Sequence, residues 1–286
     1  MIQNIDNYAN DFETLNNLKN KEKLTFEFEQ HITEGIAIAF SGGVDSSLLL
    51  KVACDVGKKF NREILAVTFE TKLHPHGDLE EARDLAQSLG AIHKTIEINE
   101  FSDQEIMNNP IDRCYRCKSL LFRTFIEYSE GEGYQYLMDG TNYDDRNAYR
   151  PGMKALKELG IHSPLLELQI TKQEIRSLAT HLEISTSDKP SAPCLATRLP
   201  YGTHFDYPLL ERIDQGEKYL RSLGFYNVRL RLHEDILRIE IDIQDFIKFI
   251  EMKDDILLRL KELDFLYITL DLEGFRSGSM DIKISR

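Results

Sequence analysis

The chain has 286 residues, of which 42% are hydrophobic and 29% charged, a balance typical of a globular protein with one large domain or two ordinary ones. Its formal net charge of −13 argues against a broad nucleic-acid surface, which needs lysine and arginine to neutralise phosphates. No apolar run approaches the ~18 residues of a membrane-spanning helix, and we recognise no signal peptide. We therefore expect a cytoplasmic protein with no membrane partner, whose four cysteines act as metal ligands or catalytic groups before disulfides.

The first two thirds of the chain alternate between helix and strand patterns. Residues 1–30 predict a polar helix with Leu15, Leu18 and Leu24 on a weak apolar stripe. Strand patterns follow at 36–40, 64–69, 91–98 and 136–140, with helix patterns at 46–60, 79–89 and 116–128 between them. This order predicts an α/β fold, in which a parallel sheet is covered by helices and binds ligands at the carboxyl ends of its strands.

The pattern changes in the last third of the chain. Thr171 and Glu174 have the spacing of a capping box at the start of a helix, and residues 186–204 predict a long loop. We then expect a helix at 209–223, strands at 227–233, 237–241 and 267–272, and an amphipathic helix with Ile243, Phe246, Ile247 and Ile250 on one face. We predict a first domain at 1–205 and a smaller α+β domain at 206–286.

A glycine-rich turn joins the first buried strand to the helix that follows. It consists of Ser41, Gly42, Gly43, Val44, Asp45, Ser46 and Ser47. The glycines allow a tight turn, and the N–H groups at a helix start attract anions. The turn lacks the lysine of a Walker A loop and resembles the PP-loop of ATP pyrophosphatases, which implies an adenine nucleotide hydrolase-like sheet. The alternative is an ordinary glycine-rich turn.

Three of the four cysteines are candidate metal ligands. Cys114 and Cys117 have the C-x-x-C spacing that lets two thiolates reach one metal, and Cys194 lies in a distant Pro-rich loop. A structural zinc site needs four ligands, whereas three thiolates suit an iron–sulfur cluster with one open iron. Cys54 lies among apolar helix residues and is expected to be inert. The alternatives are thiols that transfer sulfur without a metal, a redox pair, zinc ligands or a structural role.

Two further groups of polar residues follow strand patterns. Gly140, Asn142 and Asp145 come directly after a strand, where they would meet the Ser41 loop and the strand around Thr68 at one edge of the sheet. Arg229 and Arg231 alternate on a predicted strand and so share one face, which suits a substrate with phosphate or carboxylate groups. The alternatives are a polar loop and a solvated or salt-bridged strand face.

Several stretches of the chain together resemble the LarE family, the ATP-dependent pyridinium-3,5-dicarboxylate mononucleotide sulfurtransferases that help to build the nickel-pincer cofactor of lactate racemase. They are SGGVDSS at 41–47, DGTNYDD at 139–145, RPG at 150–152, KPSAPCLATRLPYGT at 189–203, RLRLH at 229–233, LRIEID at 237–242 and LDLEGFRSGSM at 270–280.

The resemblance implies a reaction with ATP and Mg²⁺. ATP would adenylate a substrate carboxylate, and sulfur would then replace AMP to leave a thiocarboxylate. The loop at 41–47 would bind the phosphates, with Asp45 as a magnesium ligand and with Thr68, Gly140 and Asn142 near the nucleotide. The resemblance also implies residues that contact the substrate or line the site: Arg198, Arg229, Arg231, Glu217, Glu240 and Asp145.

The chain departs from the single-cysteine members of that family, in which the cysteine matching Cys194 gives up its own sulfur and becomes dehydroalanine. Here Cys114 and Cys117 are also present, as in the subgroup whose three cysteines hold a 4Fe–4S cluster. The resemblance therefore implies that Cys194 is a cluster ligand and that sulfide, or another sulfur donor, supplies the sulfur. It also implies a homo-oligomer, since related enzymes form hexamers. The alternatives are a PP-loop tRNA thiolase and an amide-forming synthetase of the NAD or GMP type.

Overall fold

The computed structural model describes residues 2–74, 78–147, 151–190, 193–276 and 278–282, and the chain divides into two compact units. Unit 1 comprises Met1–Thr71, Gly77–Ile98 and Cys114–Ser191, and unit 2 comprises Lys72–His76, Asn99–Arg113 and Ala192–Arg286. The predicted division after residue 205 is a single cut along the chain, whereas unit 2 also contains two earlier segments.

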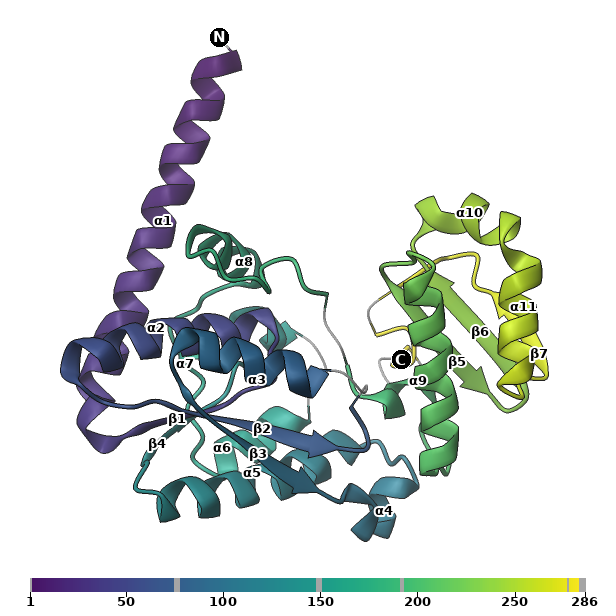
Figure 1. The fold of residues 1–286 in the computed structure, drawn as a ribbon, viewed down its shortest axis with the longest axis horizontal. Coiled ribbons are helices and arrows are strands. Elements are labelled where there is room, and N and C mark those ends of the chain that lie inside the picture. The colour runs from purple at the N-terminus through teal and green to yellow at the C-terminus, as the bar shows by residue number, and fades with distance from the viewer. Residues whose placement is uncertain (1, 75–77, 148–150, 191–192, 277, 283–286) are drawn as a thin grey trace. The chain divides into compact units, whose positions relative to one another are not determined.

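Unit 1 has the predicted architecture, a parallel sheet covered by helices (Figure 1). The sheet has the order β3-β2-β1-β4, made by β1 (Ile36–Ala39), β2 (Leu65–Thr71), β3 (Ile92–Ile98) and β4 (Tyr136–Met138). The helices are α1 (Ile2–His31), α2 (Val44–Phe60), α3 (Asp78–Leu89), α5 (Arg113–Gly131), α6 (Gly152–Glu158), α7 (Pro164–Glu167) and α8 (Lys172–His181). The predicted capping box of α8 is confirmed, because the side chain of Thr171 and that of Glu174 each accept from the other's backbone N–H.

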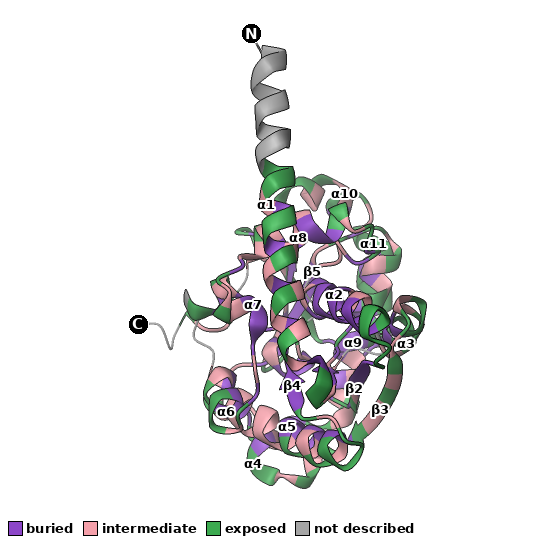
Figure 2. Ribbon diagram, turned by 90° about the vertical axis from the view of Figure 1, so that its left-hand side faces the viewer, coloured by how far each residue is buried: buried purple, intermediate pink, exposed green. Residues whose placement is uncertain are grey.

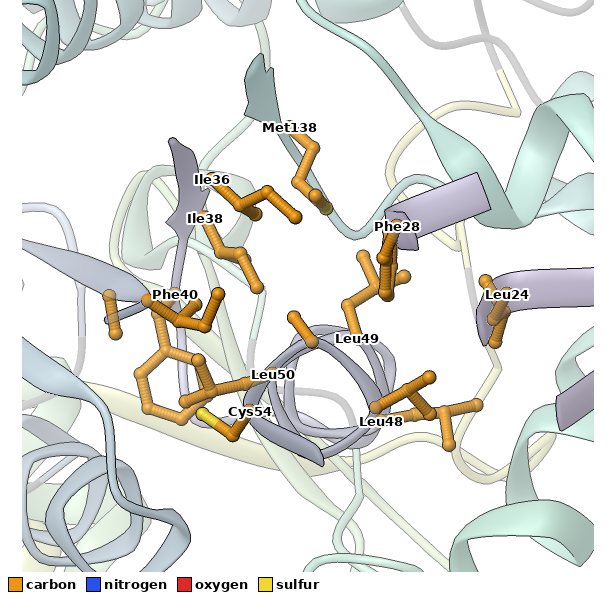
Figure 3. Packing of buried hydrophobic residues seen from close by; sticks show 14 of the residues in the cluster. Leu24, Phe28, Ile36, Ile38, Phe40, Leu48, Leu49, Leu50, Cys54 and Met138 are labelled. Atoms are coloured by element: carbon orange, nitrogen blue, oxygen red, sulfur yellow. The ribbon is translucent and has the colours of Figure 1, made fainter. Parts of the chain in front are cut away.

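Side chains of β1 alternate between two apolar layers, which explains why the strand is buried on both faces. Ile36 and Ile38 belong to the layer that contains α2 and α8, and Figure 3 shows them pointing toward Leu49 of α2. Ala37 belongs to the opposite layer, which it shares with Phe125 of α5. The strand that leads into the glycine-rich turn is therefore packed between two apolar cores.

The apolar stripe predicted on α1 is only partly correct. Leu24 is fully buried, but Leu15 and Leu18 are 65% and 45% exposed. The buried side of α1 instead passes through Asn20, Leu24 and Phe28, positions four apart in sequence that face one side of a helix. Figure 2 shows the exposed side of α1 in green.

Unit 2 is a small mixed sheet with helices, as predicted. Its sheet has the order β5-β6-β7, made by β5 (Val228–His233), β6 (Ile236–Ile241) and β7 (Tyr267–Leu270). Strands β5 and β6 are antiparallel, and β6 and β7 are parallel. The helical elements are α4 (Gln104–Met107), the 3-10 turn η4 (Leu195–Arg198), α9 (Tyr207–Ser222), α10 (Phe246–Glu251) and α11 (Lys253–Glu262).

The apolar face predicted for the helix near residue 243 does not lie in the core. Ile243, Ile247 and Ile250 are 66%, 76% and 55% exposed, whereas Phe249 is buried. A 3-10 turn at Ile243–Asp245 precedes α10, so the helix starts later and its inward face differs from the one that a continuous 3.6-residue period predicts. Among the described residues, no helix is both long and apolar enough to cross a membrane.

Candidate active site

The glycine-rich turn ends β1 and starts α2, as predicted. Gly42 has a φ of 68°, a conformation that glycine adopts without steric cost. Gly43 is the N-cap of α2, and as a glycine it has no side chain that could cap the N–H groups of the first helical turn. Ser46 stiffens the turn, because its Oγ donates to the Gly43 carbonyl at 3.1 Å and accepts from the Ser41 N–H at 3.3 Å. The arrangement leaves backbone donors and the positive end of a helix for an anion.

The segment after β4 meets this turn, as predicted. A Cβ added to Gly140 would lie 3.1 Å from the Ser46 backbone nitrogen, so only glycine allows this approach without a shift of the loop. Asn142 Nδ2 donates to Asp45 Oδ1 at 3.4 Å, and Asp145 Oδ2 accepts from the Asn142 N–H at 3.1 Å. These contacts bring several of the predicted residues together at the carboxyl edge of the sheet: Asp45, Ser46, Gly140, Asn142 and Asp145.

Lys172 belongs to the same group and was missed by the sequence analysis. Its Nζ lies 2.5 Å from Asp45 Oδ2, and its backbone N–H donates to Asp144 at 2.8 Å. The sequence contains the signal that places it, since Lys172 directly follows the N-cap Thr171 and must lie in the first turn of α8. An ammonium and a carboxylate here offer a phosphate contact and a hard oxygen ligand of the kind that Mg²⁺ prefers.

Thr68 lies within β2 rather than at its end, because β2 continues to Thr71. Its Oγ1 donates to the carbonyl of Phe40, the last residue before the turn, at 2.8 Å and lies 2.8 Å from His93 Nε2. Burial, followed by the charge of Arg83, lowers the pKa of His93, which favours the neutral imidazole. Thr68 therefore supports the backbone between the end of β1 and the turn that starts at Ser41.

The C-x-x-C pair lies near the start of α5. Cys114 and Cys117 are half-buried, and three residues of helix place them on the same side. Lys118, the next residue, lies 3.4 Å from Asp139, which directly follows β4. Within unit 1, the two cysteines therefore stand at the edge of the sheet that carries the glycine-rich turn.

The predicted substrate residues of unit 2 lie on η4, α9, β5 and β6 and are buried. Arg229 stands opposite Glu240 in the register of β5 and β6, and Arg231 donates from Nε to Glu240 at 3.1 Å. Burial, and then the like charge of Arg198, lowers the pKa of Arg229 to about 10. Arg198 and Glu217 form an ion pair whose side chains are fully buried. The prediction that these residues contact substrate stays a prediction.

The remaining cysteines differ in their surroundings. Cys194 is half-buried and is the N-cap of η4, whereas Cys54 is buried in the core of unit 1, where burial raises the pKa of its thiol to about 11. Among the described residues, no three histidine, cysteine, aspartate or glutamate side chains are gathered closely enough to hold a metal ion. Arg150 of the RPG stretch lies outside the described residues.

Comparison with known proteins agrees with this geometry. A family model described as a PP-loop domain matches residues 16–146. The pyridinium-3,5-bisthiocarboxylic acid mononucleotide synthase of Lactiplantibacillus plantarum is 37% identical over 251 residues, which are 88% of this chain and 90% of that protein. The chain belongs to the LarE family. The uncharacterized protein slr1717 of Synechocystis sp. is 40% identical over 85% of this chain and 91% of its own length.

A more distant match concerns the thiolases of tRNA. The tRNA-specific 2-thiouridylase MnmA of Rickettsia bellii is 25% identical over 198 residues, but these are only 55% of this chain and 52% of that protein. The match to the L. plantarum synthase covers 88% of this chain, a much larger share. The protein is therefore an enzyme with an ATP-binding PP-loop, an ATP-dependent sulfurtransferase.

Proposed function

We propose that this LarE protein converts the carboxylates of pyridinium-3,5-dicarboxylate mononucleotide into thiocarboxylates. The observation that carries the proposal is the 37% identity over 88% of the chain to a relative named for the bisthiocarboxylic acid product. The PP-loop supports it, because the N-cap of α2 is Gly43, which has no side chain to compete with phosphate for the helix N-terminus.

In the proposed reaction, a substrate carboxylate oxygen attacks the α-phosphorus of ATP and pyrophosphate leaves with the electron pair of the broken P–O bond. The acyl adenylate then accepts a sulfur nucleophile at its carbonyl carbon, and AMP leaves. The N–H groups of α2 and the ammonium of Lys172 would stabilise the charge that develops on the phosphates. Asp45 would hold Mg²⁺, and Asn142, 3.4 Å away, would orient its carboxylate.

Arg229 and Arg231 are proposed to hold the phosphate or a carboxylate of the substrate. Besides burial, the charges of Arg198, Arg221 and Arg231 act to lower the pKa of Arg229, and the charge of Glu217 acts to raise it. An anion beside Arg229 would relieve this repulsion, which supports a substrate anion there.

We also propose that Cys114, Cys117 and Cys194 hold a 4Fe–4S cluster, which would offer an open iron where an extra sulfide can bind. The donor set fits, because three thiolates leave one iron of such a cluster without a protein ligand.

Purified enzyme with ATP, Mg²⁺, sulfide and the dicarboxylate mononucleotide tests the function directly. We expect AMP, pyrophosphate and a thiocarboxylate product by mass spectrometry, and their loss in Asp45→Asn. Asp55→Asn is the matched control, because Asp55 lies on the same helix and pairs with Lys51 away from the turn. Thiolation of tRNA with no turnover of the mononucleotide would favour the thiolase alternative.

Anaerobic iron and sulfide analysis tests the cluster. We expect about four irons per chain and a sharp fall in Cys114→Ala. Cys54→Ala removes a buried thiol from the same protein and should leave the iron content unchanged. Full sulfur transfer by iron-free protein would overturn the cluster proposal.

A further inference from the structure

The guanidinium of Arg198 joins α9 to the turn at residues 193–198, which we call the Cys194 turn. Arg198 Nη1 donates to the carbonyls of Pro193 and Cys194 at 2.7 and 3.1 Å and to Thr197 Oγ1 at 3.0 Å. Its Nε and Nη2 donate to the two oxygens of Glu217, both at 2.8 Å. The side chain is fully buried, so these contacts exchange little with water.

Both carboxylate oxygens of Glu217 accept hydrogen bonds from neighbouring residues. Besides Arg198, the Leu230 N–H donates to Oε1 at 3.0 Å and Arg221 donates to Oε2 at 2.6 Å. Burial acts to raise the pKa of Glu217, but Arg198 and the other arginines outweigh it and lower that pKa to about 2. The carboxylate is therefore a charged anchor that ties α9 to β5, with its lone pairs already used.

A second arginine holds the other end of the turn. Arg231 Nη1 donates to the Thr197 carbonyl at 2.9 Å while its Nε is bound to Glu240. Thr197 Oγ1 donates to the Cys194 carbonyl at 2.7 Å. The carbonyls of Pro193, Cys194 and Thr197 thus all accept hydrogen bonds, and the conformation of the turn is fixed by buried charged side chains.

We propose that Arg198 and Glu217 are positioning residues, which hold the Cys194 turn so that the sulfur keeps one direction, and that they do not contact the substrate. This inference rests on the proposed role of Cys194 in sulfur transfer. A buried ion pair is a poor source of stability compared with apolar packing, so a role in shaping the turn explains its presence better. Arginine is required because a lysine ammonium cannot reach two carboxylate oxygens and three further acceptors from one plane.

Hydrogen exchange followed by mass spectrometry tests the inference in the full-length protein. In Arg198→Lys, we expect the peptide spanning residues 193–199 to exchange at least about tenfold faster, since several charged hydrogen bonds are lost, while β6 stays protected. Arg221→Lys is the matched control, because Arg221 bonds to Glu217 but to none of the carbonyls of the turn. Unchanged exchange in Arg198→Lys would overturn the inference.

Steady-state kinetics separate positioning from substrate binding. Misplacement of the sulfur in Arg198→Lys should lower kcat by about 100-fold with little change in KM for the mononucleotide. If Arg198 instead contacted the substrate, Arg198→Lys should raise KM for the mononucleotide. The rise should be limited, because lysine keeps the positive charge. If the wild type does not act on the mononucleotide, the proposed function fails, but the exchange experiment still decides the structural claim.

A milder variant covers the case in which Arg198→Lys does not fold. Thr197→Ala removes one acceptor of Arg198 and the hydroxyl that closes the turn, and it leaves the buried ion pair intact. We expect faster exchange in the turn and a lower kcat, both restored in Thr197→Ser, which keeps the hydroxyl. Equal exchange in the alanine and serine variants would contradict the proposed clamp.

Discussion

The two chemical regions of this LarE protein are built from different parts of the chain. The PP-loop in unit 1 presents backbone N–H groups and depends on glycines and small hydroxyls. The Cys194 turn in unit 2 is shaped by the buried side chains of Arg198, Glu217 and Arg231. Substitutions that add atoms should therefore disturb the PP-loop most, and substitutions that remove a buried charge should disturb the Cys194 turn most.

Removal of the central anion of unit 2 should have the largest effect. Glu217→Ala leaves the buried Arg198 without its partner, and we expect the free energy of unfolding to fall by about 3–5 kcal/mol. Urea denaturation measures this. Glu211→Ala on the same helix, where Glu211 has only a 3.5 Å contact to Gln215, should change the free energy by less than about 0.5 kcal/mol. Similar values for the two variants would mean that the buried pair does not hold unit 2 together.

The second largest effect is expected from a methyl group added to the PP-loop. Gly42→Ala forces a left-handed backbone at a cost of about 1–2 kcal/mol. Its Cβ would also lie 3.1 Å from the Cβ of Ala82. We expect a loss of ATP-dependent AMP formation larger than the loss of stability. Gly131→Ala is the control, because a Cβ there meets none of the described atoms within 4 Å. Normal AMP formation by Gly42→Ala would show that the turn does not need this conformation.

The pH dependence of stability should differ between the wild type and Glu217→Gln. The pKa of Glu217 is lowered from 4.5 to about 2, against the effect of burial, chiefly by Arg198. A lowered pKa stabilises the fold above the unfolded value, and that contribution is lost as pH falls from 4.5 toward 2. The difference in unfolding free energy between the two proteins should therefore shrink between pH 5 and pH 3, measured by urea titration. A constant difference across this range would contradict the assignment.

The smallest effect on stability is expected at Lys172. Lys172→Gln breaks a partly exposed pair with Asp45, worth about 0–1 kcal/mol, so the melting temperature should hardly move. If Lys172 contacts phosphate, KM for ATP should nevertheless rise several-fold. Lys51→Gln breaks a similar pair with Asp55 on α2 and should leave KM for ATP unchanged. Equal kinetics in both variants would remove Lys172 from the nucleotide site.

Local signals predicted much of the fold. The strand, glycine turn and helix around Ser41 follow from residue types that act within a few positions, and so does the capping box of Thr171. The exposed Ile247 and the mostly exposed Leu15 stripe were mispredicted, because an apolar period does not say which side of a helix meets the core.

The contacts in the site that the sequence could not predict join side chains from different elements of the fold. Lys172 meets Asp45 across 127 positions, and Arg198 meets Glu217 through the packing of η4 on α9. The resemblance to the LarE family marked Arg198 as a substrate contact, and that role stays a prediction, because the direction of its side chain depends on the fold. The three-cysteine cluster, the sulfur donor and a homo-oligomer stay predictions.

The stoichiometry of sulfur transfer tests the central claim most directly. Anaerobic protein, supplied with ATP, Mg²⁺, sulfide and the dicarboxylate mononucleotide, would be followed by mass spectrometry of both product and chain. Catalytic transfer predicts more than one thiocarboxylate per chain, one AMP for each, and a chain of unchanged mass. At most one thiocarboxylate per chain, with the chain lighter by one H₂S, would show that Cys194 is consumed and would contradict the account.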